Sequence, residues 1–239
     1  MHHKRRFGLA VAVVLAFQAE AASSLKLNEQ GYFEAPGLNV TVFADIYPDG
    51  HQTGVTVIQH GERVAANGDL RLEPSPGQWS PVPAGDGKAS FDPATGSLVQ
   101  TLRYPDPGKD RKGFNPIEYP DLHFSYKVAV TPLDGHSFQV SVHLDQPLPA
   151  EWEGKVGFNF ELFPGDLFGK SFLMDGKSGT FPRQANGPVA VVEGHTITAP
   201  LASGRTLVVA PENPLQRLKI ESRSGRLDLI DGRGNMNNG

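Results

Sequence analysis

The chain has 239 residues, with 22 Lys or Arg against 26 Asp or Glu, and it contains no cysteine. Without cysteine, the sequence excludes a disulfide scaffold, a zinc–thiolate site, a catalytic cysteine and an iron–sulfur cluster. The formal net charge of −4 comes from acidic and basic residues that are interspersed along the chain, a pattern that indicates no nucleic-acid partner.

The first residues are typical of a secretion signal. Met1 to Arg6 is basic, Phe7 to Phe17 is uncharged, and Ala19-Glu20-Ala21 matches the Ala-x-Ala cleavage pattern. The uncharged run is shorter than the roughly 20 residues that a membrane-spanning helix needs, so we expect no membrane anchor. We predict a signal peptide over residues 1–21, cleavage after Ala21, and export to the periplasm or the extracellular space.

Apolar and polar residues alternate along most of the remaining chain, as in half-buried strands. The strands predicted in this way cover residues 38–42, 54–60, 98–104, 122–130, 138–144, 155–163, 189–193, 205–210, 217–223 and 226–230. Turn dipeptides that contain Gly separate many of them, and no segment has a helical period. We therefore predict one all-β domain over residues 22–239, a large, mostly antiparallel β-sandwich (supersandwich-like) with long irregular loops.

The clearest pair of strands lies in the middle of the chain. Residues 122–130 and 138–144 alternate strictly, and Asp134-Gly135 between them is a hairpin signal. His123 and His143 are expected on the polar face of this hairpin, as neighbours across the sheet. Two histidines supply only part of a zinc site, and we predict no metal site here.

Three long stretches mix Gly and Pro with aromatic and charged residues: 73–93, 105–120 and 164–188. Loops of this length are usually functional or disordered. Because these three are not low in aromatic residues, we predict ordered loops that pack over one rim of the sheets. After the last predicted strand, the residues from Asp231 onward are typical of a turn that a further strand would follow. We interpret the domain as truncated at its C-terminus; the alternative is a natural flexible tail.

Several segments together resemble a known family. They are Leu27-Asn28-Glu29-Gln30-Gly31-Tyr32-Phe33, residues 66–72 (ANGDLRL), 76–79 (PGQW), 157–164 (GFNFELFP), 168–171 (FGKS) and 181–184 (FPRQ). The resemblance is to the N-terminal β-sandwich region of secreted bacterial glycoside hydrolases related to family 9, the cellulase-like enzymes. It implies that catalysis belongs to a separate α-helical barrel downstream, so no catalytic residue is assigned to this chain.

Five residues are candidates for ligand contact. Glu161 and Asn159 share one face of a predicted strand and are expected to form the floor of a sugar-binding groove. Lys170 and Arg183 stand beside Phe residues in the third loop, and charged groups next to aromatic rings suit carbohydrate. Trp79 is a candidate stacking platform. The alternatives are a solvated strand face, Phe residues that fill the space beneath the loop, and a Trp that closes the end of the sandwich.

The sequence therefore predicts an accessory β-sandwich of a secreted enzyme for β-glucan or related polysaccharide breakdown. Its expected partners are an oligo- or polysaccharide and the downstream catalytic domain of the same polypeptide; no cofactor is expected. One alternative is a stand-alone periplasmic glycan-binding protein. Another is a small polysaccharide lyase or hydrolase that uses Glu161 with Arg183 or Lys170.

Overall fold

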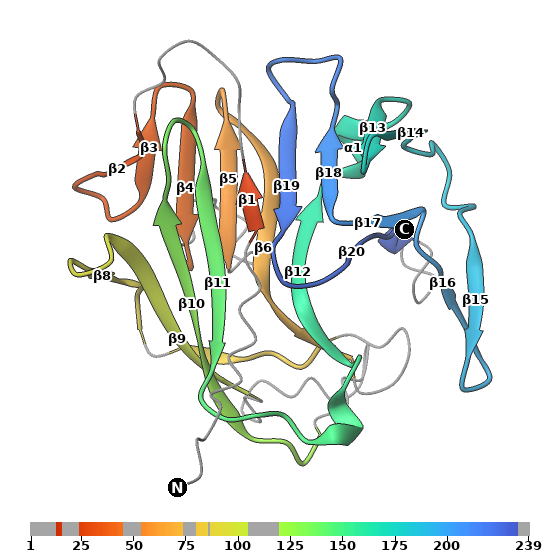
Figure 1. Cartoon of the computed structure of the whole chain (residues 1–239), viewed down its shortest axis with the longest axis horizontal. Helices are drawn as coiled ribbons and strands as arrows, with labels where there is room; N and C mark the ends of the chain where they lie inside the picture. The colour runs from red at the N-terminus through yellow and green to blue at the C-terminus, as the bar shows by residue number, and fades with distance from the viewer. Residues whose placement is uncertain are drawn as a thin grey trace, which may run out of the picture.

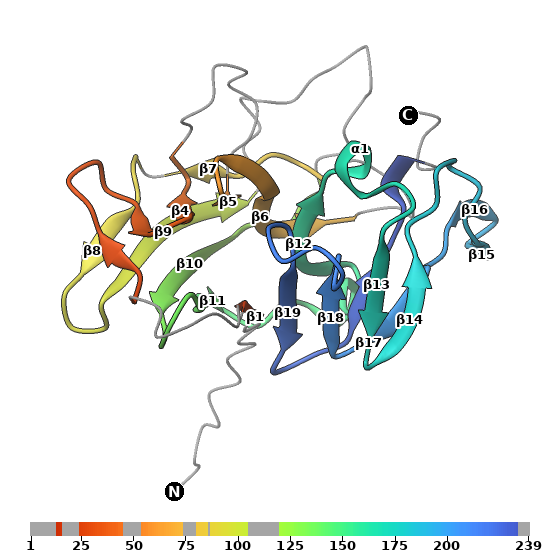
Figure 2. The same ribbon diagram turned by 90° about the horizontal axis from the view of Figure 1, so that it is seen from above.

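The computed structural model describes residues 13–15, 24–44, 54–73, 80–85, 87–104 and 120–233. These residues form a β-sandwich of a ten-stranded sheet (the large sheet) and a six-stranded sheet (the small sheet), with two further two-stranded sheets (Figures 1 and 2). The strand pairs within each sheet are antiparallel. The predicted all-β, mostly antiparallel sandwich is thus confirmed.

The large sheet contains, in spatial order, β14 (Lys177–Thr180), β13 (Ser171–Met174), β18 (Thr206–Val209), β19 (Leu218–Ser222), β1 (Val13–Leu15), β11 (Phe138–Leu144), β10 (Phe124–Pro132), β9 (Ser97–Tyr104) and β7 (Ala84–Gly85), with β8 (Ser90–Asp92) also paired to β9. The small sheet contains β12 (Val156–Leu162), β6 (Glu62–Leu72), β5 (Val55–Gln59), β4 (Leu38–Val42), β3 (Phe33–Ala35) and β2 (Lys26–Leu27). The remaining elements are the pairs β15 (Val189–Val192) with β16 (His195–Thr198) and β17 (Ala202–Gly204) with β20 (Leu227–Leu229), the short helix α1 (Pro164–Leu167) and the 3₁₀ turn η2 (Ala150–Trp152).

The core lies between the inner faces of the two main sheets. Phe33 and Val57 from the small sheet and Tyr126 and Phe138 from the large sheet are almost fully buried. Their alternation with more exposed residues along each strand is the period-two pattern that the sequence contains. Burial of these apolar faces stabilises the sandwich through the hydrophobic effect. The chain has no disulfide that would add a covalent link between the sheets.

The predicted central hairpin is confirmed as β10 and β11, which pair from Tyr126 opposite Leu144 to Pro132 opposite Phe138. The expected pairing of His123 with His143 is wrong. His143 lies opposite Lys127, whereas His123 precedes β10 and lies 3.6 Å from the carboxylate of Asp121. The two histidines are therefore not cross-strand neighbours in this register.

Two of the three predicted irregular loops contain strands. Segment 164–188 includes α1, β13 and β14, and segment 73–93 includes β7 and β8. β13 and β14 meet at Asp175-Gly176, where both residues have positive φ angles of 48° and 80°. That conformation is the type I′ turn that Asp-Gly favours, so this hairpin signal was present in the sequence. The third segment, 105–120, lies outside the described residues except for Pro120.

The β15–β16 pair is a separate ribbon at one side of the molecule (Figure 1). Val189 and Val191 on β15 have 68% and 72% of their surfaces exposed, values that are unusual for valine in a strand. Neither strand pairs with another strand among the described residues. The ribbon therefore leaves its valine side chains exposed to solvent, and within the described residues no third strand covers either of its edges.

The longest strand, β6, was not predicted because a β-bulge interrupts its alternation. The ladder between β6 and β12 shifts register between Asn159 and Glu161. Asn67, at a positive φ of 52°, donates a hydrogen bond of 2.7 Å from its side-chain amide to Glu161. Gly68 follows, and a Cβ atom there would lie 2.8 Å from Val55 Cβ and 2.9 Å from the ring of Phe160. The bulge therefore requires glycine at position 68.

Gly68→Ala should lower the free energy of unfolding by about 1–3 kcal/mol, because the added methyl group overpacks the space between Val55 and Phe160. Gly157→Ala on the adjacent strand is the matched control, since a Cβ there meets no atom within 4 Å. Urea denaturation of both variants measures the difference. Equal stabilities of the two variants would contradict this account of the bulge.

Candidate functional site

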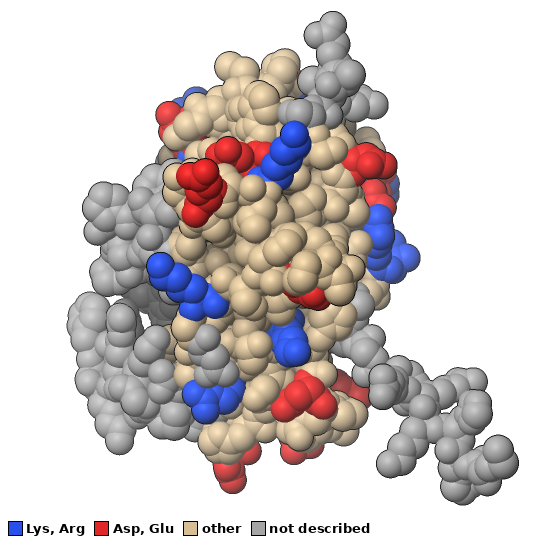
Figure 3. Space-filling view, turned by 90° about the vertical axis from the view of Figure 1, so that its left-hand side faces the viewer, with Lys and Arg blue, Asp and Glu red and all other residues tan. Residues whose placement is uncertain are grey.

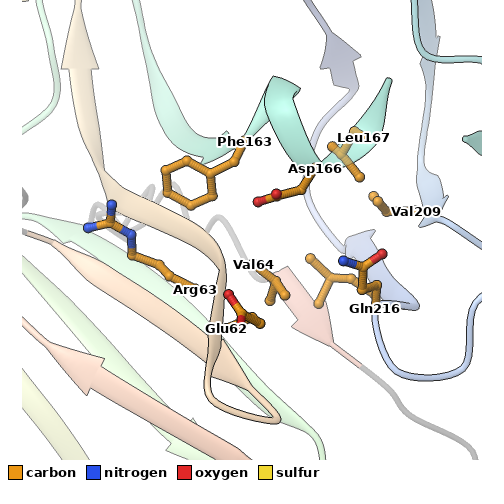
Figure 4. Close-up of a pocket in the computed structure, with 9 residues that line it drawn as sticks. Glu62, Arg63, Val64, Phe163, Asp166, Leu167, Val209 and Gln216 are labelled. Atoms are coloured by element: carbon orange, nitrogen blue, oxygen red, sulfur yellow. The ribbon is translucent and has the colours of Figure 1, made fainter. Parts of the chain in front are cut away.

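A cavity of about 360 Å³ opens where the start of β6 faces α1 and the ends of β18 and β19 (Figure 4). Its polar lining residues are Glu62, Arg63, Asp166 and Gln216. Its apolar lining residues are Val64, Phe163, Leu167, Val209 and Leu218. This volume is at the lower end of the range of small-ligand sites, roughly 300–1,000 Å³, which combine apolar walls with a few polar groups.

An aromatic ring and a cation meet on one wall of this cavity. The guanidinium carbon of Arg63 lies 4.8 Å from the centroid of the Phe163 ring, within the range of a cation–π contact. Figure 4 shows the Arg63 side chain extending along β6 toward Phe163. The contact holds a planar donor group over one face of the ring at the cavity wall, where it can meet the hydroxyl groups of a ligand.

The predicted residue Lys170 stands behind the opposite wall. Its ammonium group donates to the backbone carbonyl of Asp166 and to the side-chain oxygen of Gln216, both of which are cavity residues. Asn213 donates a further hydrogen bond of 2.9 Å to the same oxygen of Gln216. Lys170 is not itself a lining residue, so it orients the Gln216 amide at the wall.

Glu161 and Asn159, the predicted groove floor, are not among the residues that line the cavity. Glu161 is exposed and accepts the hydrogen bond from Asn67 that braces the bulge. Asn159 lies opposite Asp69 in the ladder between β12 and β6. The side of β12 that carries Phe158 packs against the core, which agrees with the predicted alternation.

Arg183 is exposed and is also not a lining residue of the cavity. Its backbone carbonyl accepts a hydrogen bond of 3.0 Å from Arg233. Arg233 also stacks over Phe168, with its guanidinium carbon 4.9 Å from the ring centroid, and forms a 2.7 Å ion pair with Asp231. These contacts tie the end of the described chain to the segment around Arg183, which is a structural role. Trp79 lies outside the described residues.

A polar network between the sheets was not predicted at all. The hydroxyl of Tyr126 donates to Asp69 at 2.9 Å, and the hydroxyl of Tyr104 donates to the Leu70 carbonyl at 2.6 Å. The two tyrosine rings stack with centroids 5.5 Å apart. Ser80 joins the network 3.2 Å from the Tyr104 hydroxyl. β9 and β10 are thereby hydrogen-bonded to β6 across the core.

Burial raises the pKa of the Asp69 carboxyl from 3.8 to about 7, and hydrogen bonds from Leu70 and Tyr126 offset part of the rise. Burial likewise raises the pKa of Tyr126, and the nearby Asp69 carboxylate adds to this effect. Among the residues that the structure describes, Asp69 is the carboxyl group whose pKa is raised toward neutrality, yet it does not line the cavity. An acid with this pKa and the ligand-sized cavity therefore occupy different places in the sandwich.

Charged side chains are scattered over the face in Figure 3, where neither sign gathers into a continuous patch among the coloured residues. The described residues contain no group of three or more His, Cys, Asp or Glu side chains placed to hold a metal ion. No helix within the described ranges is long and apolar enough to cross a bilayer.

Comparison with known protein families, with curated proteins and with solved structures finds no match for this chain. The cavity and the Asp69 network are therefore interpreted from their own geometry and chemistry.

Asp69→Asn should flatten the pH dependence of stability. Because the pKa of Asp69 rises from 3.8 to about 7 on folding, its protonated form favours the folded state. This contribution is fully present below about pH 4 and is lost as the pH rises through about 7. Between these two values we expect the unfolding free energy of the wild type to fall relative to that of Asp69→Asn. Chemical denaturation in pH steps measures the difference.

Asp175→Asn is the control of opposite sign. Backbone N–H groups of Arg205 and Thr206 lower the pKa of Asp175, so its stabilising effect is lost as the pH falls. Parallel pH profiles for wild type and Asp69→Asn would show that Asp69 titrates normally and would contradict the prediction.

Proposed function

We propose that this chain is the N-terminal accessory β-sandwich region of an exported carbohydrate-active enzyme. A downstream domain of the same polypeptide carries out the catalysis, and the leader over residues 1–21 is removed on export. The substrate class is a β-glucan or a related polysaccharide. In this proposal the cavity beside α1 contacts the glycan and helps to present it to the catalytic domain.

The observation that carries the proposal is the separation of the cavity from Asp69, the one carboxyl group among the described residues whose pKa is raised toward neutrality. Glycoside hydrolysis needs a general acid with a raised pKa and a second carboxylate on the other side of the scissile bond. Asp69, whose pKa is about 7, hydrogen-bonds Tyr126 between the sheets and does not line the cavity. The cavity lining combines a ring, a guanidinium and an amide with the carboxylates of Glu62 and Asp166, but it does not include the carboxyl group of raised pKa, which favours binding over hydrolysis.

Calorimetric titration of the protein with soluble β-glucan oligosaccharides tests the glycan contact, and we expect saturable binding. Phe163→Ala should weaken that binding by about fivefold or more, since truncation of a stacking ring at a contact surface costs about 1 kcal/mol or more. Gln216→Ala, which removes a polar group of the wall, should weaken it without altering the ring. Arg183→Ala is the control, because Arg183 does not line the cavity.

The same preparations report on catalysis. We expect no release of reducing sugar by the chain alone. Two carboxylates, Glu62 and Asp166, do line the cavity, so a hydrolytic activity that is lost in Glu62→Gln or Asp166→Asn would overturn the accessory role. Binding that is unaffected by Phe163→Ala and Gln216→Ala would remove the cavity from the proposal.

A further inference from the structure

The strand β1 occupies an unusual place in the large sheet. It lies between β11 and β19 and is antiparallel to both (Figure 1). Its residues stand opposite Phe138–Val140 on one side and opposite Ile220–Ser222 on the other. β11 and β19 therefore run parallel to each other and are joined only through β1 in the described sheet.

The large sheet depends on a strand in this place. Neighbouring strands lie about 4.8 Å apart, so β11 and β19 are separated by about 10 Å, too far for direct hydrogen bonds. Phe138 and Ile220 beside the gap are buried, and backbone groups at buried positions are costly to leave unpaired. Direct closure would also need a parallel pair within an otherwise antiparallel sheet.

β1 belongs to the segment that the sequence predicts to be removed. Cleavage after Ala21 would take Val13–Leu15 out of the sheet. We propose that the place of β1 is a strand-acceptor site, which in the mature protein binds an apolar strand from the polypeptide that follows Gly239. The source of that strand rests on the proposed function, because the downstream polypeptide belongs to that function.

The flanking residues define the strand that fits. Positions opposite the buried side chains of Phe138, Val140 and Ile220 face the core, so alternate residues of the incoming strand must be apolar. The position between them lies opposite Gln139 and Glu221, which are only half-buried, and tolerates a polar residue. Proline is excluded because a central strand uses its N–H groups on both sides.

The neighbouring strand β11 is longer than β1, so a longer strand could pair with it. β1 covers three residues of β11, whereas β11 has seven and continues to Leu144. On the outer face, Arg223 after β19 donates a hydrogen bond of 3.1 Å to Gln139 on β11. This contact spans the acceptor site from one border to the other.

The described strands already occupy positions in the sheets. Of the internal segments 45–53, 74–79 and 105–119, only the last contains the required pattern, as Ile117-Glu118-Tyr119, and Pro116 and Pro120 limit it to three residues. Residues 234–239 are Gly, Asn and one Met. A strand from the same polypeptide also has a higher effective concentration than a separate protein. These points favour the downstream chain as the source.

The acceptor site is tested on the chain of residues 1–239 by hydrogen exchange. Val14→Pro removes a ladder donor from β1, so amides of β11 and β19 beside the site should exchange about tenfold faster or more. A synthetic peptide of residues 10–17 should restore their protection, whereas the same peptide with Val14→Pro should not. Unchanged exchange in the Val14→Pro protein, or no effect of the first peptide, overturns the acceptor site.

The source of the strand is tested in the natural, processed protein. A photo-crosslinking amino acid in place of Glu221 should capture a segment that follows Gly239, and mass spectrometry identifies it. The same replacement of Lys127, whose strand already has β9 and β11 as neighbours, is the control and should not capture that segment. Crosslinks to Thr206 on β18 are expected in any case, since Thr206 lies opposite Glu221. Capture of a separate protein, or of no segment that follows Gly239, overturns the proposed source. A natural protein that ends at Gly239 overturns the source and the proposed function, but leaves the exchange result intact.

Discussion

Burial of one apolar face of each main sheet is the constraint on which this structure depends. The chain has no disulfide, and metal-binding clusters are absent from its described residues, so packing between the sheets must hold them together. Only a few polar groups interrupt this core. Tyr126 and Tyr104 place their rings among apolar residues and direct their hydroxyls to β6. The core thus fixes the distance between the sheets, and the hydroxyls fix how β9 and β10 stand relative to β6.

The strict period of two made the fold class predictable from the sequence. β10 and β11 alternate without interruption around Asp134-Gly135, and their pairing is the one that the pattern indicates. β6 escaped prediction because Asn67 and Gly68 break its alternation at the bulge. The β13–β14 hairpin was hidden because two strands of four residues each fell within a Gly-rich stretch that was interpreted as a loop. Local turn chemistry would have identified it, since Asp175-Gly176 is a hairpin signal of the same kind.

The candidate site was much less predictable than the fold. Lys170 was singled out for its charge beside aromatic residues. It does stand next to the cavity, but its ammonium group donates a hydrogen bond to Gln216. Arg63 and Phe163 meet only because β6 and the segment before α1 converge, and nothing in their spacing of a hundred positions along the chain reports this. Asp69 and Tyr126 are likewise brought together by the packing of two sheets. Contacts of this kind depend on the relative placement of strands, which period-two patterns do not specify.

The β15–β16 ribbon has a consequence for handling the protein. Native sheet proteins usually protect their edges with charges, proline or a covering loop, whereas Val189 and Val191 leave this ribbon apolar as well as open. Two such ribbons can add to each other through backbone hydrogen bonds and exclude water from their valine side chains. We therefore expect concentration-dependent aggregation of the isolated chain to begin at this ribbon, ahead of any loss of the sandwich itself.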